Sequence, residues 1–136
     1  MTIVGDGTLK KTRLNLIEKK GLQASTELVG ACGGLEPFLA QADIFVHPAV
    51  KPGRTDELLA AMASKLPAVA LETAATRALI THGVSGVLAA DEAAFVAALD
   101  KLMVDWGYRV GLAVAATKVQ QQRPLDAFIR TVWEIL

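Results

Sequence analysis

The feature that most constrains the fold is a regular alternation of short apolar runs with longer segments of helical period. The short runs have β-type composition and lie at residues 2–5, 27–29, 43–47, 68–71 and 86–89. The helical segments between them lie at residues 9–20, 36–41, 56–64 and 74–82. Such an alternation produces parallel strands joined by crossover helices. The sequence therefore predicts an α/β protein with a doubly wound parallel sheet of about five strands and helices on both faces.

Several boundaries of these helices carry their own signals. Gly21 and Gly83 are expected to end two helices, because glycine adopts the left-handed conformation without a Cβ clash. Thr73 and Asp91 are expected to open the next helices by accepting hydrogen bonds from free backbone N–H groups. His82 is expected to be a cation near a helix C-terminus.

The end of the chain, residues 91–136, is predicted to be an all-helical tail. It is expected to divide near Asp105 and again at Pro124, since proline is tolerated in a first helical turn but not inside a helix. Three aromatic residues of the tail are expected to be packing residues or, if exposed, to mark a face for another domain: Trp106, Tyr108 and Trp133.

The composition indicates one folded domain over residues 1–136. A length of 136 residues is close to the commonest size of a single domain. An apolar share of 52% with 21% charged residues argues for a sheet buried on both faces and against disorder. Basic and acidic residues number 14 each, so the net charge would attract neither nucleic acid nor an anionic membrane.

Cysteine usage and hydropathy bear on location. Cys32 is the only cysteine, which excludes an internal disulfide and a cysteine zinc cluster and fits a reducing cytoplasm. No apolar run approaches the roughly 20 residues that a membrane span needs, and the start has no signal-peptide pattern. We therefore expect a cytoplasmic protein without a membrane span. His47 and His82 lack the spacing of metal ligands, so no metal site is expected.

The first motif is a glycine turn at residues 3–7, which read Ile-Val-Gly-Asp-Gly. Such a turn between a strand and a helix either lets the backbone approach a phosphate or serves only the steric needs of the joint. The dinucleotide fingerprint needs three spaced glycines, and only Gly5 and Gly7 are present. The phosphate-loop motif of nucleotide triphosphatases is absent as well. Neither NAD nor another cofactor is therefore expected.

A longer pattern lies in the middle of the chain. Residues 42–49 read Ala-Asp-Ile-Phe-Val-His-Pro-Ala, and residues 58–70 read Leu-Leu-Ala-Ala-Met-Ala-Ser-Lys-Leu-Pro-Ala-Val-Ala. With the glycine turn and with Gly-Val-Ser-Gly at 83–86, these segments resemble the retaining glycosyltransferases of family 4, or group 1. The lipopolysaccharide-core branch carries the same His-Pro-Ala. The resemblance runs from residue 3 to about 116 and implies a Rossmann-like, C-terminal nucleotide-sugar-binding domain of the two-domain GT-B type.

Two glutamates of the family pattern are replaced. The family places one glutamate at the start of a glycine-rich loop and another eight residues later, where they contact donor sugar and ribose. Alignment puts Pro52 and Ala60 at these positions. Loss of a ribose-binding carboxylate removes a hydrogen bond worth roughly 1.5–3 kcal/mol, or about one to two decades of affinity. Donor binding is therefore expected to be weak or altered, while Asp56 and Glu57 either supply substitute oxygens or cap the following helix.

A second departure concerns the first strand of the family domain. That strand and its helix carry an arginine and a lysine that bind the donor diphosphate, and this sequence starts at what resembles the second strand. In the family order the absent strand lies between those at residues 2–5 and 43–47. Either these two strands pair directly, or another copy or a partner fills the gap, because an open gap would leave backbone groups unsatisfied.

In open α/β sheets the ligand crevice lies outside the carboxyl ends of the strands. The resemblance implies a nucleotide-sugar site there, without assigned catalytic or metal-binding residues, formed by Gly5, Gly7, Gly30, Ala31, His47, Lys51, Gly53, Arg54 and Glu57. Lys51 and Arg54 are either phosphate ligands or solvated loop charges. His47 either donates to a sugar hydroxyl or makes a structural hydrogen bond.

The resemblance implies the donor-binding half of a hexosyltransferase that acts in polysaccharide or lipopolysaccharide synthesis. Such a half should be inactive alone, because GT-B chemistry takes place between two domains. The expected partners are a nucleoside diphosphate sugar and either a second glycosyltransferase half or a second copy of the chain. Two alternatives stay open: a non-catalytic binding or regulatory module, and a small unrelated Rossmann-like nucleotide-binding protein. The latter explains the glycine turn but not the match at residues 61–67.

Overall fold

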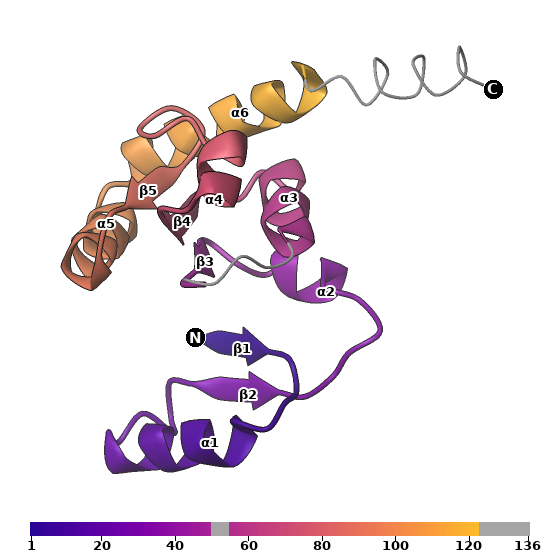
Figure 1. Cartoon of the computed structure of the whole chain (residues 1–136), viewed down its shortest axis with the longest axis vertical. Coiled ribbons are helices and arrows are strands. Elements are labelled where there is room, and N and C mark those ends of the chain that lie inside the picture. Colours follow the sequence, from indigo (N-terminus) through magenta and orange to yellow (C-terminus); the bar gives the residue numbers. More distant parts are fainter. Residues whose placement is uncertain (50–54, 123–136) are drawn as a thin grey trace. The chain divides into compact units, whose positions relative to one another are not determined.

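The computed structural model describes residues 1–49 and 55–122, with side chains as far as residue 118. The chain divides into two compact units, Met1–Phe38 and Leu39–Leu136. In the described residues, five strands alternate with helices and two further helices follow the last strand (Figure 1). Every strand lies within one of the five runs that the sequence predicts.

The first unit is a single strand-helix-strand crossover. Its elements are β1 (Thr2–Val4), α1 (Lys10–Lys19) and β2 (Glu27–Val29). The two strands pair in parallel, starting with Thr2 opposite Glu27, as a helical crossover requires. Gly21 follows α1 with a φ of 65°, and its N–H donates to the carbonyl of Glu18. The prediction that Gly21 ends this helix is confirmed.

A short helix, α2 (Glu36–Leu39), leads to the second unit, whose strands pair in the order β3-β4-β5. Both pairings are parallel. The elements are β3 (Phe45–His47), α3 (Asp56–Ala63), β4 (Ala68–Leu71), α4 (Ala74–Leu79), β5 (Val87–Ala89), α5 (Glu92–Val104) and α6 (Trp106–Gln122). The central position of β4 accounts for its composition, since Ala68, Val69 and Ala70 are fully buried.

Helices cover both faces of this second sheet. Alternate side chains of a strand point to opposite faces, and those of β4 belong to two different clusters. Ala68 and Ala70 lie in the first, which contains Leu58, Met62, Ala68, Ala70, Ile80 and Ala116. Val69 lies in the second, which contains Val69, Val87, Leu102 and Leu112. The predicted doubly wound α/β arrangement is therefore confirmed.

The two N-caps that the sequence predicts are present. The side chain of Asp91 accepts a hydrogen bond from the N–H of Ala94 at 2.8 Å. The Thr73 hydroxyl accepts from the N–H of Thr76 at 3.1 Å, and the Thr76 hydroxyl accepts in return from the N–H of Thr73 at 2.8 Å. This reciprocal pair is a capping box, and it fixes the start of α4 directly after β4.

Helices α5 and α6 meet at Asp105, where the sequence predicts a break. The Asp105 side chain caps α6 by accepting from the N–H of Tyr108 at 2.9 Å. Tyr108 packs beside the second cluster, with the ammonium of Lys101 at 4.1 Å from its ring centroid. Trp106, by contrast, is 70% exposed, so the expectation that it packs is wrong, and whether it marks a face for another domain stays a prediction. Trp133 lies outside the described residues.

The end of α4 differs from the prediction. The helix ends at Leu79 because Ile80 turns extended and buries its side chain in the first cluster. Gly83, with a φ of 74°, therefore forms the turn before β5 instead of ending a helix. His82 lies in the turn after α4 and not in its last turn, and its Nδ1 accepts the N–H of Leu88 at 3.1 Å.

The α/β fold with parallel strands and C-terminal helices is thus established, and the helical tail is confirmed as far as residue 122. The rest of the predicted tail, residues 123–136, lies outside the described residues. A single domain over residues 1–136 stays a prediction. Among residues 1–49 and 55–122, no helix combines the length and apolar character that crossing a membrane would require.

Candidate functional site

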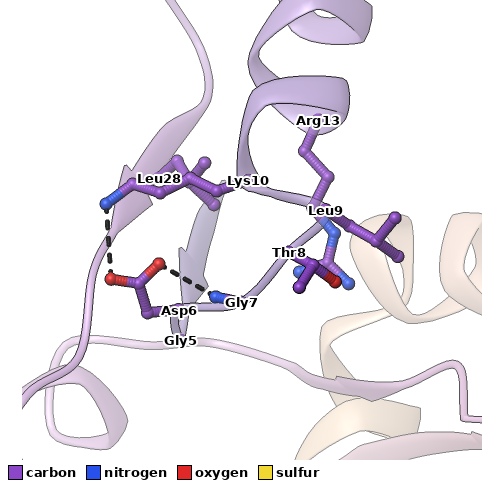
Figure 2. Close-up of a pocket in the computed structure, with 8 residues that line it drawn as sticks. All are labelled: Gly5, Asp6, Gly7, Thr8, Leu9, Lys10, Arg13 and Leu28. Carbon is purple, nitrogen blue, oxygen red and sulfur yellow. Dashed lines mark hydrogen bonds and ion pairs between the residues drawn. The ribbon is translucent and has the colours of Figure 1, made fainter.

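The glycine turn between β1 and α1 borders a cavity of about 160 Å³ (Figure 2). Gly5 has a φ of 132°, a conformation that L side chains rarely adopt, which explains the glycine at this position. Its N–H donates to the carbonyl of Val29 at 3.0 Å, so the turn starts directly from the paired strands. The cavity is lined by Gly5, Asp6, Gly7, Thr8, Leu9, Lys10, Arg13 and Leu28.

A carboxylate and two cations give this cavity its charge. Asp6 accepts a hydrogen bond from the N–H of Gly7 at 2.9 Å, and its other oxygen lies 3.6 Å from Nζ of Lys10. Arg13 adds a second positive charge, and no acidic side chain among the described residues pairs with it. Two cations against one carboxylate leave the cavity with an excess of one positive charge.

The carboxyl end of β2 reaches the same place. Gly30 directly follows β2, and a Cβ placed on it would lie 3.5 Å from Nζ of Lys10 and 3.8 Å from Oδ2 of Asp6. Gly30 thus lies beside the same turn as Gly5 and Gly7, and the part of these glycines in a nucleotide-sugar site stays a prediction. Ala31 is the next residue in the chain and is exposed, but it is not part of the cavity lining.

Two further predicted site residues belong to the second unit. His47 ends β3 half-buried, with its ring 6.5 Å from that of Phe45 and inclined by 21° to it. Glu57 lies half-buried in the first turn of α3, whose N-cap residue Thr55 makes no side-chain capping bond. Ala60, at the position of the second family glutamate, is half-buried on the same helix. Whether these residues complete one crevice with the glycine turn stays a prediction.

The remaining predicted residues fall in the loop before α3. Lys51, Gly53 and Arg54 lie outside the described residues, as does Pro52. Their proposed contacts with phosphate therefore stay predictions. Among the described residues, no group of three or more histidine, cysteine, aspartate or glutamate side chains is arranged to hold a metal ion.

Sequence reasoning missed the three charged side chains that line the cavity: Asp6, Lys10 and Arg13. The signal that could have found them is their spacing. Lys10 and Arg13 are three residues apart on α1, so they share one face of the helix, and that face begins where the glycine turn ends. Asp6 was noted only as a part of the turn.

Comparison with known sequences gives one family. The family model described as "Glycosyl transferases group 1" matches residues 1–105. EpsD of Bacillus subtilis (strain 168), which bears a glycosyltransferase name, is 29% identical to this chain over 104 residues. The aligned part makes up 75% of this chain but only 27% of EpsD.

Solved structures share the fold at low sequence identity. HepE from Anabaena, in complex with UDP, matches with a TM-score of 0.86 and 21% identity over 99% of this chain and 40% of HepE. WaaG, a glycosyltransferase involved in lipopolysaccharide biosynthesis, matches with a TM-score of 0.82 and 20% identity, over 98% of this chain and 37% of WaaG. The C-terminal domain of LpcC, a glycosyl transferase group 1 family protein from Francisella tularensis, matches with a TM-score of 0.73 and 23% identity. The match covers 85% of this chain and 62% of the LpcC domain. The chain thus has the fold of a C-terminal GT-B domain and spans less than half of HepE and WaaG.

Proposed function

Because this chain belongs to the group 1 glycosyltransferases, we propose that it binds a nucleoside diphosphate sugar and forms the donor-side domain of a hexosyltransferase. The observation that supports this most is the family match over residues 1–105, which includes the glycine turn, His47 and the start of α3. Three glycines at the carboxyl ends of two parallel strands suit the close approach of a nucleotide.

Uridine is the favoured base and glucose a candidate sugar. HepE crystallises with UDP and with UDP-glucose, and its fold matches nearly the whole of this chain. A role in polysaccharide or lipopolysaccharide synthesis is supported by the likeness to WaaG. The ionic balance of the whole chain and its lone Cys32 suit a cytoplasmic enzyme that draws on soluble nucleotide sugars.

Catalysis should require a second domain. Transfer needs donor and acceptor held together in one cleft, and orientation of this kind is worth several orders of magnitude in rate. A second glycosyltransferase half or a second copy of the chain is the proposed source of that domain. The chain by itself is therefore expected to bind donor without transferring sugar.

A second candidate function is a non-catalytic nucleotide-sugar-binding or regulatory module. Ala60 favours it, because a methyl group stands where the family has a ribose-binding glutamate. Glu57, one turn earlier on α3, is the nearest described carboxylate in sequence that could take over this role. Both candidates predict weak donor binding, and they differ in whether a partner restores sugar transfer.

Isothermal titration calorimetry of the full chain with UDP, GDP and their glucose conjugates tests the proposal. We expect binding in the high micromolar to millimolar range with UDP preferred, since one charge-assisted contact fewer costs about one to two decades. His47→Ala should weaken binding of UDP-glucose more than binding of UDP, because the proposed partner of His47 is a sugar hydroxyl. Absence of heat with every nucleotide at millimolar concentration would refute donor binding.

A further inference from the structure

Helix α6 leaves an apolar face exposed. The residues of this outer stripe recur at spacings of three and four, which places them on one side of the helix: Trp106, Gly107, Val110, Gly111 and Val114. The opposite side carries Leu112 and Ala116, which are buried in the two clusters. Met103 and Val104, at the end of α5, continue the apolar surface and are 63% and 85% exposed.

We infer that the outer stripe of α6 is the interface through which two copies of this chain associate. A twofold interface uses the same surface on both copies, so that surface must carry both a protruding side chain and a recess that accepts it. Trp106 is the protruding side chain. Gly107 and Gly111, one turn apart, form the recess. A Cβ placed on Gly111 would have no heavy atom within 4 Å, and one placed on Gly107 would lie 3.7 Å from Oδ1 of Asp105.

An antiparallel pair of α6 helices brings the protruding side chain and the recess together. With the twofold axis level with residues 108 and 109, Trp106 of one copy lies opposite Gly111 of the other. Val110 then lies opposite Gly107 of the other copy. Because glycine has no side chain, the two helices can approach to the short end of the usual separation, about 8 Å. Met103 and Val104 extend the contact at both ends of the stripe.

The exposed surface is large enough for a dimer of modest affinity. At their exposures in the structure, Met103, Val104, Trp106, Val110 and Val114 offer roughly 600 Å² on each copy, a size at which apolar patches mark interaction sites. Burial of most of this surface on two copies removes about 1,000 Å² from solvent, which is the lower limit for a specific interface. We therefore expect a dissociation constant in the micromolar range.

Charge does not oppose association of two copies. The outer stripe consists of apolar residues and glycine, so no like charges meet across the twofold axis. The whole chain has 14 basic and 14 acidic residues, and two copies therefore do not repel each other at neutral pH. The same balance gives an anionic lipid surface or a nucleic acid no electrostatic advantage over a second copy.

Sedimentation velocity of the full chain, from low micromolar to millimolar concentration, tests the inference. We expect a reversible equilibrium between monomer and dimer. Trp106→Ala should weaken dimerisation about thirtyfold or more, as is typical of a central aromatic residue. Gly111→Leu should weaken it at least about tenfold by filling the recess. At concentrations where the chain is monomeric, Gly111→Leu should nevertheless raise the melting temperature by a few degrees, because leucine favours a helix more than glycine does.

Two valines of equal exposure provide a matched control. Val114 lies on the outer stripe and Val84 lies in the turn before β5, and each is 52% exposed. Val114→Gln should weaken dimerisation several-fold, because it removes apolar surface from the interface. Val84→Gln should leave the dissociation constant within about twofold of the wild type. Circular dichroism checks that each variant is folded.

Three results would overturn the inference. The first is a chain that stays monomeric at every concentration; if it then floats with phosphatidylcholine vesicles and Trp106→Ala does not, the stripe binds lipid instead. The second is a dimer that persists unchanged in Trp106→Ala and Gly111→Leu, since it must use another surface. The third is an equal loss of dimer in Val84→Gln and Val114→Gln. None of these measurements uses a nucleotide, so they leave the proposed donor binding untouched.

Discussion

The sharpest stability prediction concerns the Thr76 hydroxyl at the start of α4. Thr76 is 1% exposed, and its hydroxyl accepts the N–H of Thr73 at 2.8 Å and donates to the carbonyl of Leu71 at 2.8 Å. Thr76→Val keeps the shape but removes both bonds. Leaving the Thr73 N–H without its acceptor costs about 1–3 kcal/mol, and the second bond adds about 1 kcal/mol. We expect a loss of about 2–4 kcal/mol in the free energy of unfolding.

Urea denaturation of the full chain, followed by circular dichroism, measures this loss. At about 3–5 °C per kcal/mol for a chain of this length, the midpoint of thermal unfolding should fall by about 6–20 °C. Thr76→Ser is the matched control, since it keeps the hydroxyl and loses one methyl group, at a cost of about 1 kcal/mol. If Thr76→Val unfolds within about 0.5 kcal/mol of the wild type, or if Thr76→Ser is the less stable of the two, the reasoning is refuted.

Three other substitutions test separate parts of the account. Lys65 has a φ of 61°, so Lys65→Gly should raise the free energy of unfolding by about 1 kcal/mol in urea denaturation, and a loss would contradict this. Arg109 donates a hydrogen bond to the carbonyl of Leu102 at 3.1 Å, so Arg109→Gln should lower the free energy of unfolding by about 1 kcal/mol. An unchanged free energy of unfolding would mean that water replaces the lost hydrogen bond. Ala60→Glu should tighten UDP-glucose binding about 10- to 100-fold in calorimetry, and unchanged affinity would remove Ala60 from the site.

Local signals predicted the elements well because each depends on few residues. The capping threonine at 73 and aspartate at 91 act within a single helical turn, so their effect can be read from adjacent sequence. Lys65 directly follows α3 and its cap Ser64 in the left-handed conformation, which glycine usually occupies at such a position. Short buried strands were equally visible, as in the apolar run of β4.

The errors come from packing between elements. Ile80 ends α4 early because its side chain is buried in the first cluster, and periodicity alone cannot show that competition. Trp106 begins α6 and is exposed, which depends on how α5 and α6 meet and cannot be read from the local sequence. His82 forms its bond with Leu88 across a turn that the misplaced helix end concealed.

The site was predicted only in part for the same reason. Gly5 and Gly7 are visible in sequence because the strand-to-helix turn requires small residues. Lys10 and Arg13 line the cavity only because the start of α1 lies beside the glycine turn and Leu28 of β2, which depends on tertiary structure.

The most direct test of the central claim is a crystal structure of the full chain with UDP. The account predicts density for the nucleotide at the carboxyl ends of the strands, beside the Gly5–Gly7 turn. Nucleotide density at the amino ends of the strands, or away from the turn altogether, would contradict it.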